Sequence, residues 1–281
     1  MAADEPLIRS VADTARWVAV YRARETERPG ALFKDLFARR LAGERGERIA
    51  KVMGGGRGAT WFFTVRTTLI DRMLMEEIAA GADMVINLAA GLDCRPYRMQ
   101  LPPGLTWVEV DMGELIDEKE AVLVNEKPNC RVERYRRDLA QPEARNELFA
   151  ELGARAKRAV ILSEGLVMYL KPDDVLALAQ HLAAQPWIRE WILDLYRPRI
   201  LRRNYRSRMG RMLRDANVEF QFAPAEGVKF FEPAGWRCAE IKSTLREAAR
   251  IGSFMFRVFR FLFERGPDEQ FAWSAICRFV H

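Results

Sequence analysis

The sequence predicts an α/β fold, in which a mostly parallel sheet of seven strands carries helices on both faces. From Asp83 onward, short apolar runs alternate with helical patterns, as in repeated β–α units. A small-residue turn ending in Gly91 follows the first apolar run, and Asp111 closes the second run twenty positions later. The first 80 residues read as helices. We therefore expect an N-terminal helical cap, 1–80, and a Rossmann-like core, 81–281.

In the cap, a helix is expected to begin near Ser10, and a longer helix is expected from about Ala59 to Ala80, where Gly81 ends it. The glycines at 54–58 are expected to form a flexible break before the longer helix. These helices, together with an insertion near 197–230, should form a lid over the core.

The core should contain strands and helices in alternation. The expected strands are Met84 to Leu88, Thr106 to Val110, Arg131 to Arg136, Ala159 to Ser163, Trp191 to Leu195, Trp236 to Ile241 and Phe271 to Phe279. The expected helices lie near Met112 to Glu126, Pro142 to Leu152, Pro172 to Ala184, Ile200 to Asp215 and Thr244 to Glu264. The last strand could be an antiparallel edge. In an open sheet of this kind, ligands bind at the carboxyl ends of the strands.

Length and composition are those of a globular protein: 281 residues, 49% hydrophobic and 30% charged. The first residues are acidic, and no run of about 18 apolar residues occurs, so we expect neither a signal peptide nor a membrane span. The four cysteines show no metal-ligand spacing. A cytoplasmic protein with reduced thiols and no metal site is therefore expected.

The charge of the chain leaves several partners open. Its net charge is +6 and its pI about 9.3, which admits nucleic acid, an anionic membrane or carboxylate substrates. The alternative is a solvated arginine-rich surface, because the arginines are spread over the predicted helices. The two histidines, His181 and His281, are too few to favour a His-ligated metal or a Ser-His-Asp triad.

The turn after the first strand and the acid after the second form the pattern of a nucleoside-binding α/β unit. Gly91 lets the backbone approach a ligand without a Cβ clash, and Asp93 follows in the same turn. The carboxylate of Asp111 can accept both ribose hydroxyls. Its alternative role is to cap the helix expected from Met112, and one residue could do both.

Two further acids follow later strands. Asp138 could accept an adenine amine, with Leu139 against the ring, and the alternative is a helix cap before Pro142. Glu164 interrupts an apolar segment, and an unpaired buried carboxylate is costly. Glu164 therefore needs a cation, which is either the α-ammonium group of a methionine moiety or a structural arginine.

Five stretches occur in an order that is specific as a set: Thr14 to Ala23, Arg66-Thr67, Asn87 to Arg98, Glu109 to Asp111 and Glu164 to Leu170. With them the chain resembles the leucine carboxyl methyltransferase superfamily of class I S-adenosylmethionine-dependent methyltransferases. Within it, the chain is most similar to the bacterial branch of tetracenomycin-type polyketide O-methyltransferases. The resemblance covers residues 10 to 200 strongly and the remainder loosely.

The resemblance implies S-adenosyl-L-methionine as cofactor and a role for each matching residue. Arg66 should hold the methionine carboxylate, and Glu164 should meet the amino-acid end of the cofactor. The other implied contacts are Gly91 and Asp93 at the cofactor turn, Asp111 at the ribose, and Asp138 and Leu139 at adenine. The family usually has glycine where this chain has Ala89. An alanine is tolerated there at negative φ, whereas a positive φ could weaken cofactor binding.

The expected reaction is methyl transfer to a small molecule, such as a secondary metabolite. The sulfonium is already electrophilic, so alignment of the nucleophile is the main task. A carboxylate is ionised at pH 7, whereas a phenol or alcohol needs a base or a cationic site. With His181 expected on an exposed helix, we expect a carboxylate or an acidic hydroxyl as acceptor. Tyr169 and Tyr196 are the candidate catalytic residues, because each ends or follows a strand on the ligand side.

Other functions remain open from the sequence. A methyltransferase for protein C-terminal carboxylates ranks lower, because no added docking domain is evident. A nucleic-acid methyltransferase is disfavoured, because no Asn-Pro-Pro-Tyr-like tetrapeptide occurs, so we expect no nucleic-acid partner. A binding protein without turnover is a further alternative. The phenylalanine-rich segment 250–265 is either a helix packed on the sheet, a homodimer face or a membrane-surface helix.

Overall fold

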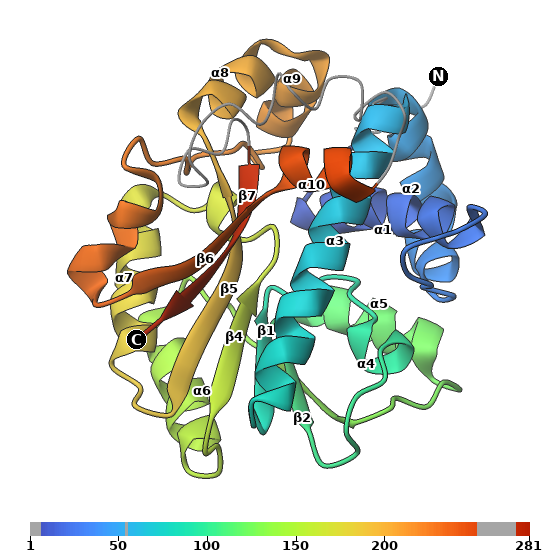
Figure 1. Cartoon of the computed structure of the whole chain (residues 1–281). Helices are drawn as coiled ribbons and strands as arrows, with labels where there is room; N and C mark the ends of the chain where they lie inside the picture. The colour runs from blue at the N-terminus through green and yellow to red at the C-terminus, as the bar shows by residue number, and fades with distance from the viewer. Residues whose placement is uncertain (1–6, 54–55, 252–273) are drawn as a thin grey trace.

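A seven-stranded sheet forms the centre of the molecule, and the computed structural model describes residues 7–53, 56–251 and 274–281 (Figure 1). Across the sheet lie β3 (Arg131–Arg136), β2 (Thr106–Asp111), β1 (Met84–Leu88), β4 (Ala159–Ser163), β5 (Ile188–Tyr196), β7 (Ser274–Val280) and β6 (Arg237–Ser243). Strands β3 to β5 in this order pair in parallel, and β7 is antiparallel to both neighbours. The expected α/β class with a mostly parallel sheet is confirmed.

Strand β7 is antiparallel, as expected, but it lies inside the sheet, so the expectation that it forms an edge is wrong. Ile276 pairs with Asp194 of β5 on one side and with Lys242 of β6 on the other. Both faces of β7 are covered, since Ala275, Ile276 and Cys277 are all fully buried. A strand that is apolar on both faces belongs inside a sheet. The edge is β6, whose residues are mostly half-buried or exposed.

Helices cover both faces of the sheet, because successive strand residues point to opposite sides. Met84 and Ile86 pack with α6 (Pro142–Gly153), α7 (Pro172–Ala183) and the short 3-10 helix η2 (Gly227–Ala234). Val85 faces the other way, onto α3 (Gly56–Ala79) and α10 (Thr244–Ile251). Helix α3 therefore packs as a helix of the core, although it precedes residue 80.

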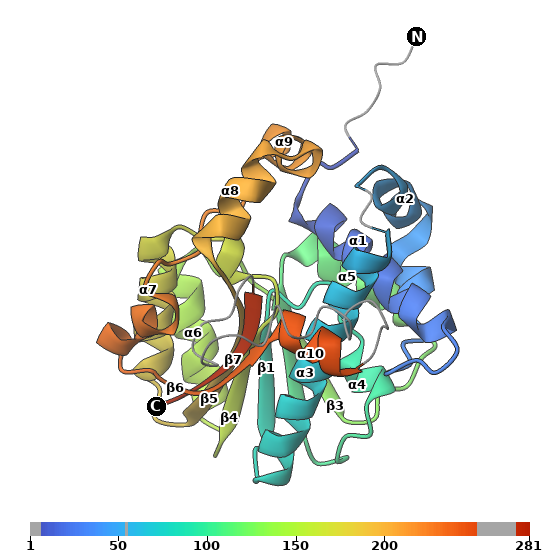
Figure 2. The ribbon, with the colours of Figure 1, turned by 45° about the horizontal axis from the view of Figure 1, so that its top comes forward.

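The remaining helices surround the carboxyl ends of the strands. They are α1 (Val11–Glu27), α2 (Ala38–Met53), α4 (Arg95–Arg98), α5 (Gly113–Leu123), the short η1 (Val167–Tyr169), α8 (Pro198–Arg206) and α9 (Arg208–Asp215). Figure 2 shows α8 and α9 rising beside α1 and α2 at this end of the molecule. A small apolar cluster joins them, in which Leu213 of α9 and Val218 pack with Ile49 of α2. Within the segment 197–230, which was expected to form a lid, α8 and α9 lie beside the N-terminal helices, whereas Phe222 and η2 pack with the core of the sheet. The role of α8 and α9 as a lid stays a prediction.

The helices expected over 200–215 and from residue 59 differ in the structure. The helix expected over Ile200 to Asp215 is two helices, because the Ser207 hydroxyl accepts the Gly210 N–H at 2.9 Å and starts a new helix. Helix α3 begins at Gly56, inside the expected glycine break. Most of the phenylalanine-rich segment 250–265 lies outside the described residues. Within the described ranges, none of the helices has the length and apolar character needed to cross a bilayer.

Candidate active site

A cavity of about 1610 Å³ lies at the carboxyl ends of the parallel strands. Every residue proposed from the sequence for the site lines it, namely Arg66, Gly91, Asp93, Asp111, Asp138, Leu139, Glu164, Tyr169 and Tyr196. Small-molecule pockets typically measure roughly 300–1,000 Å³. The cavity therefore has room for a nucleoside cofactor and a second molecule.

Asp111 joins the first two strands at the cavity wall. Its carboxylate accepts the Gly91 N–H and the Met112 N–H, both at 2.7 Å. Burial raises the pKa of Asp111 above its usual value. The alternative role as a cap of α5 is wrong, because Met112 holds the cap position and Asp111 bonds no N–H of the helix itself. An ionised carboxylate has about four acceptor positions, so two stay open toward the cavity.

The turn after β1 is left-handed at both Ala89 (φ 54°) and Gly91 (φ 51°). Glycine adopts this conformation freely, whereas an alanine is strained there. A Cβ on Gly91 would also lie 3.4 Å from the Ala15 Cβ of α1. Ala89 thus has the positive φ, which is the alternative that could weaken cofactor binding.

Glu164 lies between two arginines at the end of β4. Its Oε1 is 2.9 Å from Arg66 Nε, and its Oε2 is 2.8 Å from Arg95 Nη1. Burial alone would raise the pKa of Glu164, but Arg95 and Arg66 outweigh it and lower the pKa. The structural-arginine alternative for Glu164 is therefore present, and the carboxylate is fully ionised before any ligand binds.

Arg66 connects Glu164 to a second buried acid. Its Nη1 lies 3.1 Å from Asp194 Oδ2, and the Tyr196 hydroxyl donates to the same oxygen at 2.8 Å. Asp194 Oδ1 also accepts the Gly165 N–H at 2.7 Å. Asp194 was missed in the sequence analysis, although a lone acid in the apolar run of β5 is the same signal that identified Glu164.

Arg95 connects Glu164 to the opposite side of the site. Its Nε donates to Asp71 of α3 at 2.7 Å, and its Nη1 donates to Asp93 at 2.7 Å. Asp93 also accepts the Asn87 amide at 2.9 Å, so its oxygens are engaged within the protein. Asp71, which also binds Arg98, carried no signal in the sequence, because an acid on a helix is ordinary.

The charges of this network suit a cationic ligand. Three buried or nearly buried arginines (Arg66, Arg95, Arg98) meet four acids (Asp71, Asp93, Glu164, Asp194), so one negative charge is in excess. Asp111 adds another negative charge nearby in the cavity wall. Among the described residues, Arg66 Nε makes no well-aligned hydrogen bond despite its closeness to Glu164. The acids therefore suit the ammonium and sulfonium groups of S-adenosyl-L-methionine, and Arg66 suits its carboxylate.

Asp138 and Leu139 follow β3 and line the same cavity. Asp138 Oδ1 accepts the Ala140 N–H at 2.9 Å within its own turn, whereas the cap position of α6 is Gln141. The alternative of a cap before Pro142 is therefore wrong for Asp138. Its contact with adenine remains a prediction.

The two candidate catalytic tyrosines are not bases in this structure. The Tyr169 hydroxyl lies 3.3 Å from Thr14 Oγ1 of α1, and burial raises its pKa. Burial and the neighbouring Asp194 raise the pKa of Tyr196 well above its usual value. Neither His181 nor His281 lines the cavity. Both tyrosines therefore stay protonated at neutral pH.

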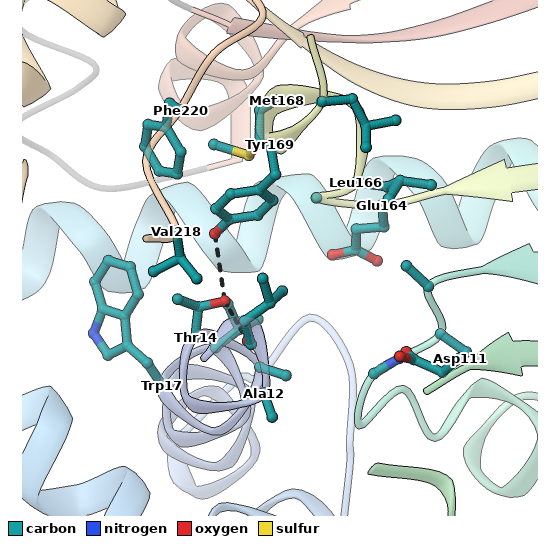
Figure 3. A pocket seen from close by; sticks show the side chains of 18 of the residues that line it. Ala12, Thr14, Trp17, Asp111, Glu164, Leu166, Met168, Tyr169, Val218 and Phe220 are labelled. Carbon is teal, nitrogen blue, oxygen red and sulfur yellow. Dashed lines mark hydrogen bonds between the residues drawn. The ribbon is translucent and has the colours of Figure 1, made fainter. Parts of the chain in front are cut away.

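Tyr169 separates two chemically different ends of the cavity (Figure 3). Glu164 and Asp111 lie on one side of it. On the other side lie Trp17 of α1, Val218 and Phe220, and the Phe220 ring packs edge-on against Tyr169 at 5.3 Å between centroids. One end is thus polar and the other apolar.

Fold and site together define a nucleoside-binding α/β protein of the methyltransferase type. Residues 15–183, more than half of the chain, match the family model described as leucine carboxyl methyltransferase. The chain belongs to the leucine carboxyl methyltransferase family. The family expectation from the five sequence stretches is confirmed.

Known proteins similar to this chain agree with that class. A relative in Streptomyces avermitilis, assigned as an S-adenosyl-L-methionine-dependent methyltransferase, is 34% identical over 185 residues, which cover 61% of this chain and 64% of the relative. A Parafrankia relative assigned likewise is 32% identical over 173 residues, covering 58% and 56%. The aligned part thus spans less than two thirds of either relative.

Two solved structures share the fold over nearly the whole chain. A DUF574 family protein from Streptomyces avermitilis superposes with a TM-score of 0.63 at 12% identity, covering 95% of this chain and 96% of that one. A protein from Thermobifida fusca solved as a candidate methyltransferase superposes with a TM-score of 0.58 at 15% identity, covering 93% and 94%. At these identities the likeness concerns the fold alone.

Proposed function

We propose that the protein is an S-adenosyl-L-methionine-dependent O-methyltransferase whose acceptor is a carboxylate, or an acidic hydroxyl, of a small molecule such as a secondary metabolite. The observation that carries the proposal is the division of one cavity at Tyr169 into an acid-lined polar end and an apolar end. The names of the relatives support the cofactor and the reaction class.

The polar end holds the cofactor. When bound, the cofactor supplies an electrophilic methyl group on its sulfonium. The two open acceptor positions of Asp111 receive the ribose hydroxyls, and Asp138 and Leu139 meet the adenine. Arg66 and Glu164 hold the carboxylate and the ammonium group of the amino-acid end. Buried ion pairs fix Arg66 and Glu164, and two backbone N–H groups fix Asp111, so these side chains are held in place before the cofactor binds.

The apolar end holds the acceptor. Tyr169 stays protonated because burial raises its pKa, so its hydroxyl can donate a hydrogen bond to an anionic acceptor in place of Thr14. A carboxylate needs no base, and neither histidine lines the cavity. Asp174 and Glu219 do line it, so a hydroxyl acceptor would depend on one of these acids as its base, whereas a carboxylate needs neither. We therefore favour the carboxylate over the hydroxyl.

The test is product analysis with isotope-labelled cofactor and matched acceptor pairs, such as 2-naphthoic acid with 2-naphthol and decanoic acid with decanol. We expect methyl esters from the acids and no ethers from the alcohols, with mass detection of each product. Tyr169→Phe should raise KM for the acid and leave cofactor affinity unchanged. A methyl ether as the main product would refute the carboxylate, and the absence of any transfer across a broad panel would favour a binding protein.

Three further expectations are retained as proposals. The four cysteines are unpaired, which supports a reducing, cytoplasmic location. The second proposal is the division of the chain at residue 80. It assigns α3 to the N-terminal part by its position in the sequence, although this helix packs on the sheet. A homodimer is the third proposal, and gel filtration with light scattering tests it.

A further inference from the structure

The positive charge of the chain is concentrated in the lid helices α8 and α9. The segment from Arg197 to Asp215 contains eight arginines and one aspartate, a net charge of +7, while the whole chain carries +6. The other residues together are therefore close to neutral, at −1. The arginines themselves are spread along the chain, as expected, whereas the net positive charge is concentrated in this segment.

The difference arises because acids balance the arginines elsewhere in number, and many of those arginines pair with one. Arg136 of β3 pairs with Asp117 and Glu120, and Arg39 pairs with Glu27 at 2.7 Å. In the lid, Arg199, Arg202, Arg206 and Arg211 are exposed, and none of them makes an ion pair with another described residue. These four arginines are called the lid arginines below.

The opposite side of the same helices faces the apolar end of the cavity. Ile200 of α8 and Met209 of α9 line the cavity, and Leu213 is buried against the cap. Val11 of α1 also lines the cavity and is 46% exposed. The same two helices therefore carry the lid arginines on their exposed side and apolar side chains that line the cavity.

An exposed aromatic residue lies among these arginines. Tyr205 of α8 is 61% exposed, and the Arg214 guanidinium lies 4.0 Å from the centre of its ring. The two helices project from the body of the molecule (Figure 2). Arginines and tyrosine on a projecting amphipathic helix are the side chains that contact the headgroups of anionic lipids.

We propose that the outer face of α8 and α9 docks on an anionic lipid bilayer, so that apolar acceptors enter the cavity from the membrane. Unpaired arginines on a projecting surface match the diffuse negative charge of a bilayer. A bilayer also explains why exposed arginines and apolar cavity-lining residues share the same two helices, which a nucleic acid, with its polar surface, does not. The docking is peripheral and reversible, and it is independent of whether the acceptor is a carboxylate or a hydroxyl.

The experiment is co-sedimentation of the full chain with vesicles of phosphatidylcholine alone, or of phosphatidylcholine and phosphatidylglycerol in equal parts. The lid variant replaces the four lid arginines with glutamine. The control variant removes four exposed arginines elsewhere, by Arg72→Gln, Arg131→Gln, Arg189→Gln and Arg237→Gln. Both variants lose four positive charges, so that net charge is matched. Circular dichroism and binding of S-adenosylhomocysteine establish that each variant is folded.

We expect the wild type and the control variant to sediment with anionic vesicles and not with neutral ones. The lid variant should partition onto anionic vesicles at least about tenfold more weakly, and about 0.5 M NaCl should release the wild type. Equal binding by the two variants would overturn the proposal, as would an absence of wild-type binding to anionic vesicles. Tighter binding to single-stranded RNA or to an acidic protein than to the vesicles, at the same salt, would also overturn it.

Discussion

Asp111→Ala is the most direct perturbation of the cofactor end. The carboxylate accepts two backbone N–H groups at 2.7 Å, from Gly91 and Met112, and keeps two acceptor positions toward the cavity. The alanine variant loses the charged hydrogen bonds to the ribose and leaves the Gly91 N–H without its acceptor. Hydrogen bonds to a charged group contribute about 1.5–3 kcal/mol. We therefore expect cofactor affinity to fall by about 10- to 150-fold.

Titration calorimetry with S-adenosyl-L-methionine measures this loss. The control is Asp117→Ala, which removes the same charge from the exposed face of α5, where Asp117 pairs with Arg136. The control should bind the cofactor as the wild type does. A Kd for Asp111→Ala within about twofold of the wild type would remove Asp111 from the site, provided that thermal unfolding shows both variants to be folded.

The remaining predictions concern strain, buried charge and pH. Ala89→Gly relieves a positive φ and should raise the free energy of unfolding by about 0.5–1 kcal/mol in urea titrations, and a loss of stability would contradict the strain. Arg95→Gln leaves the buried Asp93 without its ion pair and should cost about 3–5 kcal/mol in the same assay. Arg136→Gln at an exposed pair should cost less than about 1 kcal/mol, and equal costs would refute the distinction. Burial raises the pKa of Asp111, and only its ionised form accepts both ribose hydroxyls. Cofactor affinity should therefore fall as the pH drops through that pKa. Asp111→Asn should abolish this pH dependence, and a variant with the wild-type pH profile would contradict the assignment to Asp111.

Two acids of the cavity could be predicted from the residues alone, because each is costly in its surroundings, whereas Arg66 was proposed only from the family resemblance. An acid that closes or interrupts an apolar strand, as Asp111 and Glu164 do, needs a partner or a ligand. Asp194 carries the same signal in β5 and could have been found in the same way. The partners themselves could not, because the pairing of Asp71 with Arg95 depends on how α3 packs against the turn after β1. Such a contact follows from the tertiary fold and leaves no local pattern.

The alternation of strands and helices predicted the fold. Each error in that prediction has a physical cause. The capping hydroxyl of Ser207 divides the lid into two helices, which a periodicity over 200–215 does not reveal. Strand β7 was placed at an edge because one of its faces carries polar residues. Its interior position is set by pairing on both sides, which joins β5 to β6 across a long separation in sequence.

The two ends of the cavity differ in how far they can change. At the polar end, Arg66 binds Glu164 and Asp194 together, so that replacing any one of the three removes a partner from at least one buried charge. At the apolar end, residues such as Val218 and Phe220 contribute packing alone, and a swap of similar volume costs less than about 1.5 kcal/mol. The cofactor end is therefore fixed by coupled electrostatics, whereas the acceptor end can be reshaped one side chain at a time. Because the lid supplies part of that apolar lining and also carries the charged outer face, changes in acceptor and changes in docking surface fall on the same two helices.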